Sequence, residues 1–183
     1  TLYEDNLVVL NQRIGIFHEI SYDAIIRNNT VQFNSIGIQP WLSGAQIQIS
    51  NSQNVEVYGN QVIVSTQGGN GITITQEDRG SGEYGAWVSY NNFVHDNTIV
   101  HLGTEGLNGV ATNWDENNFW QNANNRFDNN LYYVFDITHT YWHWNDQRQS
   151  WGNLQGIGQE INGTISTAFP DGIEQIPTWS HNR

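Results

Sequence analysis

The chain has 183 residues, enough for one domain with a sizeable core. It contains 18 acidic residues against 6 basic ones, none of them lysine, so its net charge of -12 repels phosphate backbones and anionic lipid. We therefore expect no nucleic-acid binding and no membrane insertion, and no apolar run is long enough to cross a bilayer. The absence of cysteine excludes disulfides and thiolate metal sites.

A short sequence motif recurs along the chain, and its spacing defines the length of each repeat. Each copy centres on an asparagine anchor, and the anchors are Asn6, Asn29, Asn60, Asn97 and Asn130. Successive anchors are separated by 23, 31, 37 and 33 residues. One coil of a β-helix needs roughly two dozen residues, so the longer steps indicate coils that carry loops.

Two columns of apolar residues accompany the anchors. Three residues before the anchors stand Tyr3, Ile26, Val57, Val94 and Phe127. Two residues after them stand Val8, Val31, Val62, Ile99 and Tyr132. Polar residues alternate with these columns, as in half-buried strands. The pattern predicts an all-β fold, a right-handed parallel β-helix of about five coils, with the anchors stacked in an amide ladder. An antiparallel β-sandwich is the alternative, and it explains the fixed columns poorly.

An earlier strand recurs in each coil as well. Ile16 and Ile47 both lie thirteen residues before an anchor, and 71–74 and 109–110 continue the same strand. The corners that follow this strand, 19–23, 50–54, 75–91 and 111–124, should therefore lie along one edge of the rod.

The end of the chain has a different pattern. We expect coils over 1–135 and a capping segment of the same domain over 136–183, in which the aromatic-rich stretch 141–151 folds over the last coil. Ser150 is placed to cap a short helix through Leu154. No cap precedes Leu2, so either upstream coils have been removed or another chain covers that end. The segment after Pro170 is not assigned.

Several longer stretches resemble one group of bacterial proteins. They are Gly15 to Asp23 with Ile26 to Val31, Gly44 to Ile47 with Asn54 to Asn60, Gln76 to Gly80, Val94 to Ile99, and Trp144-Asn145 with Trp151 to Gln159. They are similar to secreted right-handed parallel β-helix repeat proteins with a pectate-lyase-like superfamily fold, commonly the C-terminal part of a longer protein. The resemblance implies an extracellular or cell-surface location and no particular activity.

Carboxylates and indoles gather on the predicted edge. We expect a carbohydrate site there, with Glu19, Asp78 and Arg79 as catalytic candidates. The substrate-binding candidates are Trp87, Trp114, Asp23 and Glu77, because acids and exposed ring faces suit sugars. The simpler interpretation is structural: loop carboxylates satisfy turn amides, the indoles fold over the core, and Arg79 beside Asp78 forms an ion pair that fixes the loop.

Two further features concern side chains on the strands. His18 shares a column with Ile49 and should point inward, whereas Glu19 should point outward and is the better acid or base. The outward column before the anchors reads Glu4, Arg27, Tyr58, His95 and Asp128. Neighbours in it are complementary, which predicts a surface ladder or a His95–Asp128 dyad.

Three functions remain open. The first is a polysaccharide-active enzyme, either a glycoside hydrolase or a polysaccharide lyase; the lyase fits less well because uronate polymers need cationic partners. The second is a non-catalytic module that binds polysaccharide. The third is a structural subunit that self-associates through open β-helix ends into a filament. No cofactor is expected, although loop carboxylates can bind calcium. The first residue, Thr1, and the lack of Met suggest a processed chain or a fragment.

Overall fold

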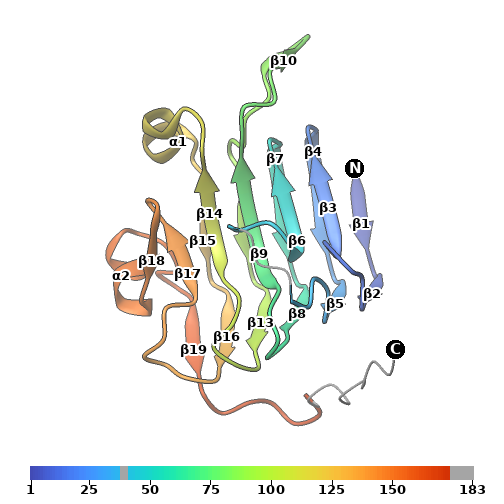
Figure 1. Ribbon diagram of the computed structural model, residues 1–183, viewed down its shortest axis with the longest axis vertical. Coiled ribbons are helices and arrows are strands. Elements are labelled where there is room, and N and C mark those ends of the chain that lie inside the picture. Colours follow the sequence, from blue (N-terminus) through green and yellow to red (C-terminus); the bar gives the residue numbers. More distant parts are fainter. Residues whose placement is uncertain (38–40, 174–183) are drawn as a thin grey trace.

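The computed structural model describes residues 1–37 and 41–173. Most of its strands form three large sheets, called A, B and C here (Figure 1). Sheet A contains β1 (Leu2–Glu4), β4 (Tyr22–Arg27), β7 (Gln53–Tyr58), β12 (Phe93–His95) and β15 (Arg126–Asp128). Sheet B contains β2 (Leu7–Val9), β5 (Thr30–Gln32), β8 (Gln61–Val64), β13 (Thr98–His101), β16 (Leu131–Val134) and β19 (Thr164–Ser166). Sheet C contains β3 (Ile16–Glu19), β6 (Ala45–Ser50), β9 (Asn70–Gln76), β14 (Asn108–Thr112), β17 (Trp142–Trp144) and β18 (Gln147–Gln149).

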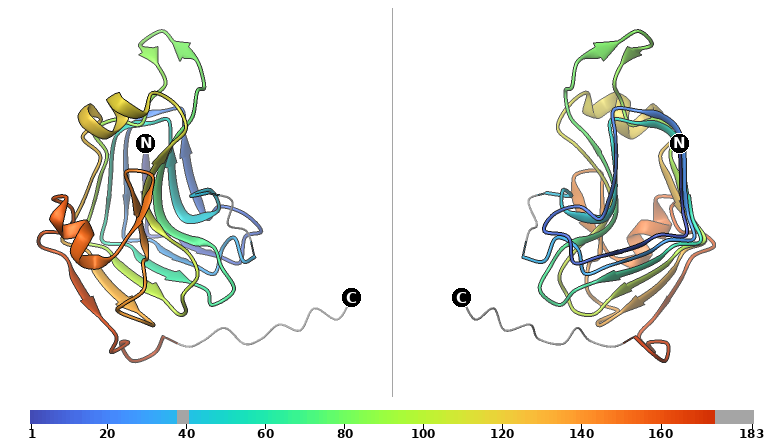
Figure 2. Two further views of the ribbon diagram at one scale, coloured as in Figure 1. Left: turned by 60° about the vertical axis from the view of Figure 1, so that its left-hand side comes forward. Right: turned by 90° about the vertical axis from the view of Figure 1, so that its right-hand side faces the viewer.

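The chain passes through the sheets in a repeating order, A then B then C. Neighbouring strands in each sheet pair in parallel, apart from the antiparallel pair β17–β18. Viewed nearly along the stack, the successive turns of the chain lie one behind another (Figure 2). The predicted all-β class is therefore confirmed, and the parallel pairing excludes an antiparallel sandwich.

The register of the sheets matches the columns predicted from the anchors. In sheet A, Ile26 pairs with Tyr3 and Val57, and the column continues to Phe127. The second apolar column runs through sheet B in the same way, from Val8 to Tyr132. From Ile26 onward the members of both columns are buried and belong to one core cluster. A one-residue slip would turn this apolar set outward, so burial specifies the register.

The anchor asparagines form the predicted amide ladder. Each of the first four donates its backbone N–H and its side-chain Nδ2 to the Oδ1 of the next anchor, as in the bonds of 3.0 and 2.9 Å from Asn29 to Asn60. The remaining Nδ2 hydrogen reaches backbone carbonyls at the corner, as from Asn60 to Ile26 and Tyr58. The ladder thus satisfies corner groups that no strand can pair.

The two ends of the stack differ. At the N-terminal end, β1, β2 and β3 are each the last strand of their sheet within the described residues. At the other end, β18 folds back on β17, and α2 (Trp151–Gly156) packs beside this hairpin. Ser150 caps α2 as predicted, its Oγ accepting a 3.3 Å hydrogen bond from the Asn153 N–H. Tyr141 and Trp142 are buried in the core, where the Trp142 ring packs edge-on against Tyr132.

The parallel sheets extend beyond residue 135, where the sequence analysis placed the start of the cap. β17 continues sheet C through Asn108↔Trp142, and β19 continues sheet B through Tyr132↔Ile165. The reason is a sixth copy of the repeat, Asn162-Gly163-Thr164-Ile165, which has glycine where the other copies have the anchor asparagine. Residues 174–183, at the end of the segment left unassigned, lie outside the described residues.

The corners between sheet C and sheet A lie at one edge, as predicted. There the β10–β11 hairpin (Ser81–Gly82 and Gly85–Ala86) projects beyond the strand ends, and α1 (Glu116–Asn122) lies at the same end (Figure 1). α1 buries Phe119 against the core. None of the helices described is long and apolar enough to span a membrane.

Candidate functional site

The loop that carries the β10–β11 hairpin is held at its base by buried amides. Asn51 donates to the carbonyls of Glu77 and Trp87, at 2.6 and 2.7 Å, and so joins the two arms of the loop. Gln76 accepts from the Ser89 N–H and donates to the Trp114 carbonyl in the following coil. These hydrogen bonds hold the base of an otherwise exposed loop in a fixed position at the end of the sheet.

Three of the predicted site residues meet at this base. One guanidinium nitrogen of Arg79 lies 3.1 Å from Glu19 Oε1 and 3.2 Å from Glu77 Oε2. We call Glu19, Glu77 and Arg79 the Arg79 cluster. The Arg79 side chain is 41% exposed, so part of its donor surface faces solvent. Ion pairs between such exposed groups contribute little to folding stability. The same side chains can therefore also form hydrogen bonds with a ligand.

The spacing of the two carboxylates can be bounded from these contacts. Because both oxygens contact the same nitrogen, they lie no farther apart than the sum of the two distances. The limit applies to one oxygen of each carboxyl, so the separation of the two groups is compatible with retaining glycosidases, at about 5–5.5 Å, and with the start of the inverting range, at roughly 6.5 Å.

The other predicted site residues have separate positions. Asp78 does not pair with Arg79, because its Oδ1 accepts a 3.0 Å hydrogen bond from the Gly80 N–H and shapes the turn. Trp87 is half-buried with its indole against Gly82 of the hairpin. Trp114 is half-buried as well, and neither indole belongs to the described core clusters. Asp23 is exposed on β4, where it accepts a hydrogen bond from Asn54, and it contacts no described member of the Arg79 cluster.

Glu19 and His18 take the predicted orientations. His18 is 3% exposed and its Nδ1 lies 3.4 Å from the Tyr3 hydroxyl. Burial lowers the pKa of His18 and favours the neutral ring. Glu19 is half-buried and reaches Arg79 on the outer side of β3.

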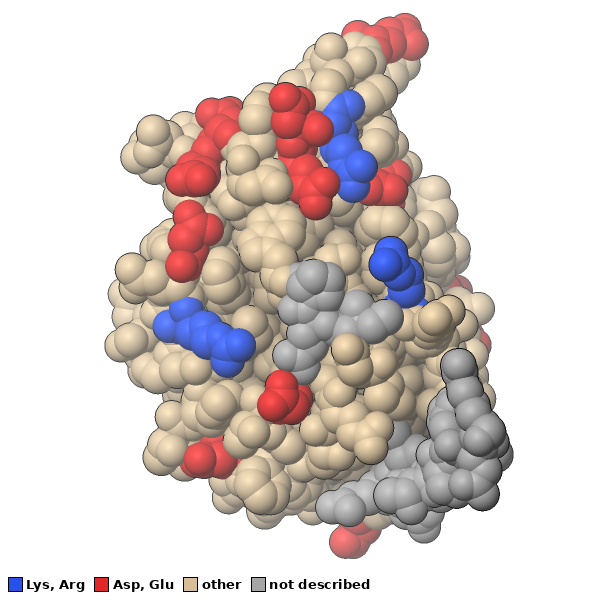
Figure 3. Space-filling view, in the orientation of Figure 1, with Lys and Arg blue, Asp and Glu red and all other residues tan. Residues whose placement is uncertain are grey.

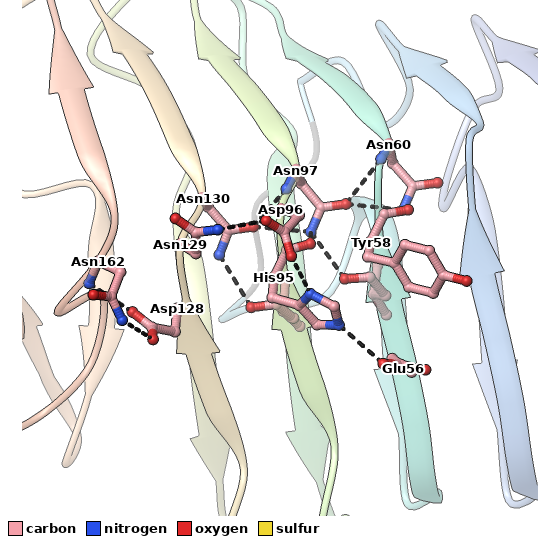
Figure 4. A network of polar contacts seen from close by, with 12 residues as sticks. Glu56, Tyr58, Asn60, His95, Asp96, Asn97, Asp128, Asn129, Asn130 and Asn162 are labelled. Atoms are coloured by element: carbon pink, nitrogen blue, oxygen red, sulfur yellow. Dashed lines mark hydrogen bonds and ion pairs between the residues drawn. The ribbon is translucent and has the colours of Figure 1, made fainter.

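The outward column on sheet A is in the predicted register, but only some of its neighbours pair. Glu4 and Arg27 form an ion pair of 2.5 Å, and Arg27 also donates to the Tyr58 hydroxyl. The His95–Asp128 dyad is not formed. His95 contacts Asp96 at 2.5 Å and Glu56 at 3.1 Å, as Figure 4 shows.

Asp128 turns toward a later part of the chain. Its carboxylate accepts hydrogen bonds from the backbone and side chain of Asn162, on the side away from His95 (Figure 4). Burial alone would raise the pKa of Asp128, but these hydrogen bonds hold it below its usual value. The correct register therefore did not determine the partner, because Asn162 offers two donors to Asp128 while His95 is engaged by Asp96 and Glu56.

The aromatic side chains on sheet A stack on one another. The His95 ring lies against Tyr58, at a centroid distance of 5.3 Å, and against Phe93, at 4.2 Å, with the rings close to parallel. The Arg126 guanidinium lies 4.5 Å from the centre of the Phe93 ring. Because ring faces are occupied by neighbours, this surface is poorly suited to stacking a sugar, and the hairpin edge is the better candidate.

The amide ladder ends in a residue that the sequence analysis missed. Asn130 donates its N–H and Nδ2 to the two oxygens of Glu160, at 3.1 and 2.7 Å, and the Tyr132 hydroxyl donates to Glu160 at 2.7 Å. Glu160 is fully buried, and burial raises its pKa to about 7. A Cβ at Gly163 would overlap Glu160 Oε2, so the carboxylate occupies the space that an anchor side chain would fill. The glycine in the sixth repeat was the available signal.

Charge and metal-binding geometry complete the description. On the face shown in Figure 3, acidic side chains gather toward the end from which the hairpin projects, with a basic side chain among them. Within residues 1–37 and 41–173, no three His, Asp or Glu side chains are arranged to hold a metal ion. Calcium binding stays a prediction.

Comparisons with known proteins identify no relative. No protein-family model matches the chain, and searches of curated proteins and of solved structures find no match.

Proposed function

We propose that the chain is a right-handed parallel β-helix whose hairpin edge binds polysaccharide at the cell exterior. The repeating passage through three parallel sheets supports the β-helix, and connections between parallel strands are right-handed in nearly all proteins. The exported location rests on the resemblance to secreted β-helix proteins.

The Arg79 cluster is the observation that carries the binding proposal. It combines an exposed planar donor with two carboxylate acceptors. The half-buried Trp87 lies on the same loop, where its backbone N–H donates to the carbonyl of Gly80, the residue after Arg79. Sugar hydroxyls accept from guanidinium and donate to carboxylates, and an indole packs on the CH face of a pyranose. The buried amides at the loop base hold these groups in place before a ligand arrives, which lowers the entropic cost of binding.

The charges favour binding of a neutral glycan without turnover. The net charge of -12 repels uronate polymers. Arg79 engages both Glu19 and Glu77, which suits fixed acceptors for sugar hydroxyls. A glycoside hydrolase that uses these two carboxylates is the alternative.

The test is a binding and turnover assay with insoluble cellulose, chitin, xylan and mannan and with soluble polygalacturonate. We expect saturable binding to a neutral polymer with no release of reducing ends or unsaturated product. Arg79→Ala and Trp87→Ala should each weaken binding about tenfold or more. Arg13→Ala is the matched control, because Arg13 is exposed and its side chain makes no ion pair with a described residue.

The outcomes separate the alternatives. Reducing-end release that Glu19→Gln abolishes would make the protein a hydrolase. Unsaturated product from polygalacturonate would make it a lyase. Failure to bind every polymer, or binding unchanged by Arg79→Ala, would reject the proposed site.

A second candidate function is self-association through the N-terminal edge. Apolar side chains concentrate there, with Leu2, Leu7 and Leu10 each more than half exposed. Asn6 starts the amide ladder, and its Oδ1 accepts no hydrogen bond from a described residue. Because β17, β18 and α2 cover the opposite end, we expect this edge to support pairs of molecules more readily than filaments. Sedimentation velocity that shows only monomer at high concentration would exclude this function.

A further inference from the structure

The C-terminal cap contains a cavity that is separate from the hairpin edge. It is shallow and widely open to solvent, it lies between the β17–β18 hairpin and α2, which neighbour each other in Figure 1, and its volume is about 530 Å³. Amide side chains and glycines form most of its wall, namely Asn145, Gln147, Gln149, Gly152, Asn153 and Gly156, and Ile157 completes it. Sites for small ligands commonly have this size.

The hairpin wall is preformed. Gln147 and Gln149 pair with Trp144 and Trp142, so their side chains share the face on which both indoles enter the core. Asn145 has φ 52° and begins a tight two-residue turn of the kind that matches strand twist. The positions of the glutamines are therefore set by the core and the turn.

The polar groups of the wall have unused hydrogen-bonding capacity. Gln149 is 8% exposed, and its Nε2 donates to the Trp144 carbonyl at 2.9 Å, but its Oε1 accepts no hydrogen bond from the described residues. The side chains of Asn145 and Gln147 likewise contact no described polar partner. The amide groups of Asn145 and Gln147 and the Oε1 of Gln149 therefore remain able to donate to or accept from a ligand in the cavity.

The side of the cavity formed by α2 leaves enough space for a sugar ring. A Cβ added at Gly152 or Gly156 would meet nothing within 4 Å, so the glycines keep the cavity open. Ile157, 40% exposed, adds an apolar surface. None of the lining residues is ionisable.

We propose that this cavity binds a neutral sugar unit of a glycan, with its hydroxyls bonded to the amides and a CH face on Ile157. Uncharged amides both donate and accept hydrogen bonds, as the hydroxyls of a sugar require. They provide no positive charge to pair with a carboxylate or phosphate group. The site uses none of the residues of the Arg79 cluster, so either site can fail without the other.

The test is an NMR titration of the full chain with cellohexaose, xylohexaose, mannohexaose and chitotriose, with trigalacturonate as the charged comparison. We expect amide shifts in residues 145–157 with at least one neutral probe. Gly156→Leu should fill the cavity and reduce affinity about tenfold or more, while the melting temperature stays equal or rises because glycine is a poor helix former. Gln147→Ala should weaken binding as well. Arg148→Ala is the matched control, since its side chain lies on the other face of the same strand.

Two sets of results would overturn the proposal. In one, no neutral probe shifts the cap residues, or trigalacturonate alone does. In the other, Gly156→Leu and Gln147→Ala bind as well as the unmodified chain. Binding that Arg79→Ala abolishes and Gly156→Leu preserves would assign the ligand to the hairpin edge alone.

Discussion

At the residue scale, the buried carboxyl of Glu160 at the end of the amide ladder makes the stability of the fold depend on pH. Its three donors come from Asn130 and Tyr132, and burial raises its pKa to about 7. Because the unfolded carboxyl titrates near 4.5, the folded chain holds an extra proton between these values. The stabilisation is complete below pH 4.5 and is lost as pH rises to about 7.

We expect Glu160→Gln to remove this pH dependence, an effect of at most about 3 kcal/mol. Fully buried His101, whose pKa burial lowers to about 4, acts with the opposite sign in nearly the same range, so the curve of the unmodified chain is a sum of both. The difference between the two chains isolates Glu160. Urea unfolding at several values between pH 4.5 and 7.5 measures it, and parallel curves would contradict the assignment.

A substitution at Gly163 tests how tightly the side chains around Glu160 are packed. A Cβ there overlaps Glu160 Oε2 and comes within 3.1 Å of the Trp151 ring, so Gly163→Ala should destabilise the chain by about 1–3 kcal/mol. Gly152→Ala is the control, because open space surrounds that position and alanine favours the helix. Thermal unfolding compares them. Equal melting temperatures for the two variants would show that the corner relaxes without cost.

At the scale of the element, the asparagines of the amide ladder make more hydrogen bonds and are more deeply buried in its interior than at its N-terminal end. Asn60 accepts two hydrogen bonds from Asn29 and donates to Asn97, Ile26 and Tyr58, and it is 1% exposed. Asn6 is exposed and its Nδ2 reaches only Glu4 and Asn29 among the described residues.

Asn60→Ala should therefore cost about 3 kcal/mol or more, since it leaves several buried groups unpaired, whereas Asn6→Ala should cost less than about 1 kcal/mol. Chemical denaturation of the two variants provides the measurement. Similar losses at both positions would mean that the ladder acts as one unit whose end matters as much as its middle.

At the scale of the whole molecule, each passage of the chain through sheets A, B and C pairs with the passages before and after it. The N-terminal strands have a partner on one side only within the described residues, while β7 lies between two strands of its sheet. Stability in such stacks is a sum of coil and interface contributions, so the free end should open first.

Amide hydrogen exchange should therefore be fastest in β1 to β3 and slowest in β7, β8 and β9, by about two orders of magnitude or more. The cap should keep β16 and β17 protected. Uniform protection along the stack would indicate global opening only, or a partner that covers the N-terminal edge. Dilution separates these explanations, because only the second depends on concentration.

The repeat was sufficient to predict the strands that end before residue 135, apart from the β10–β11 hairpin, together with their parallel register and the edge that holds the corner loops. Each of these follows from burying an apolar column and stacking an asparagine at a fixed step, which are periodic and local in the sequence. The same logic placed His18 inward and predicted Ser150 as a helix cap. It missed the sixth copy because Gly163 replaces the anchor.

Only the tertiary structure decided which side chains meet. Arg79 contacts Glu19, 60 positions earlier, instead of its neighbour Asp78, and Asp128 pairs with Asn162 instead of His95. Glu160, a carboxylate at the position that is apolar in the other copies of the repeat, ends the ladder, and the cap cavity arises where a hairpin meets a helix. Long polar side chains have several donors and acceptors within reach, so their partners depend on loop paths that no period records. Apolar burial, by contrast, allows one register, and for that reason the sequence by itself determined the framework and left the sites to the fold.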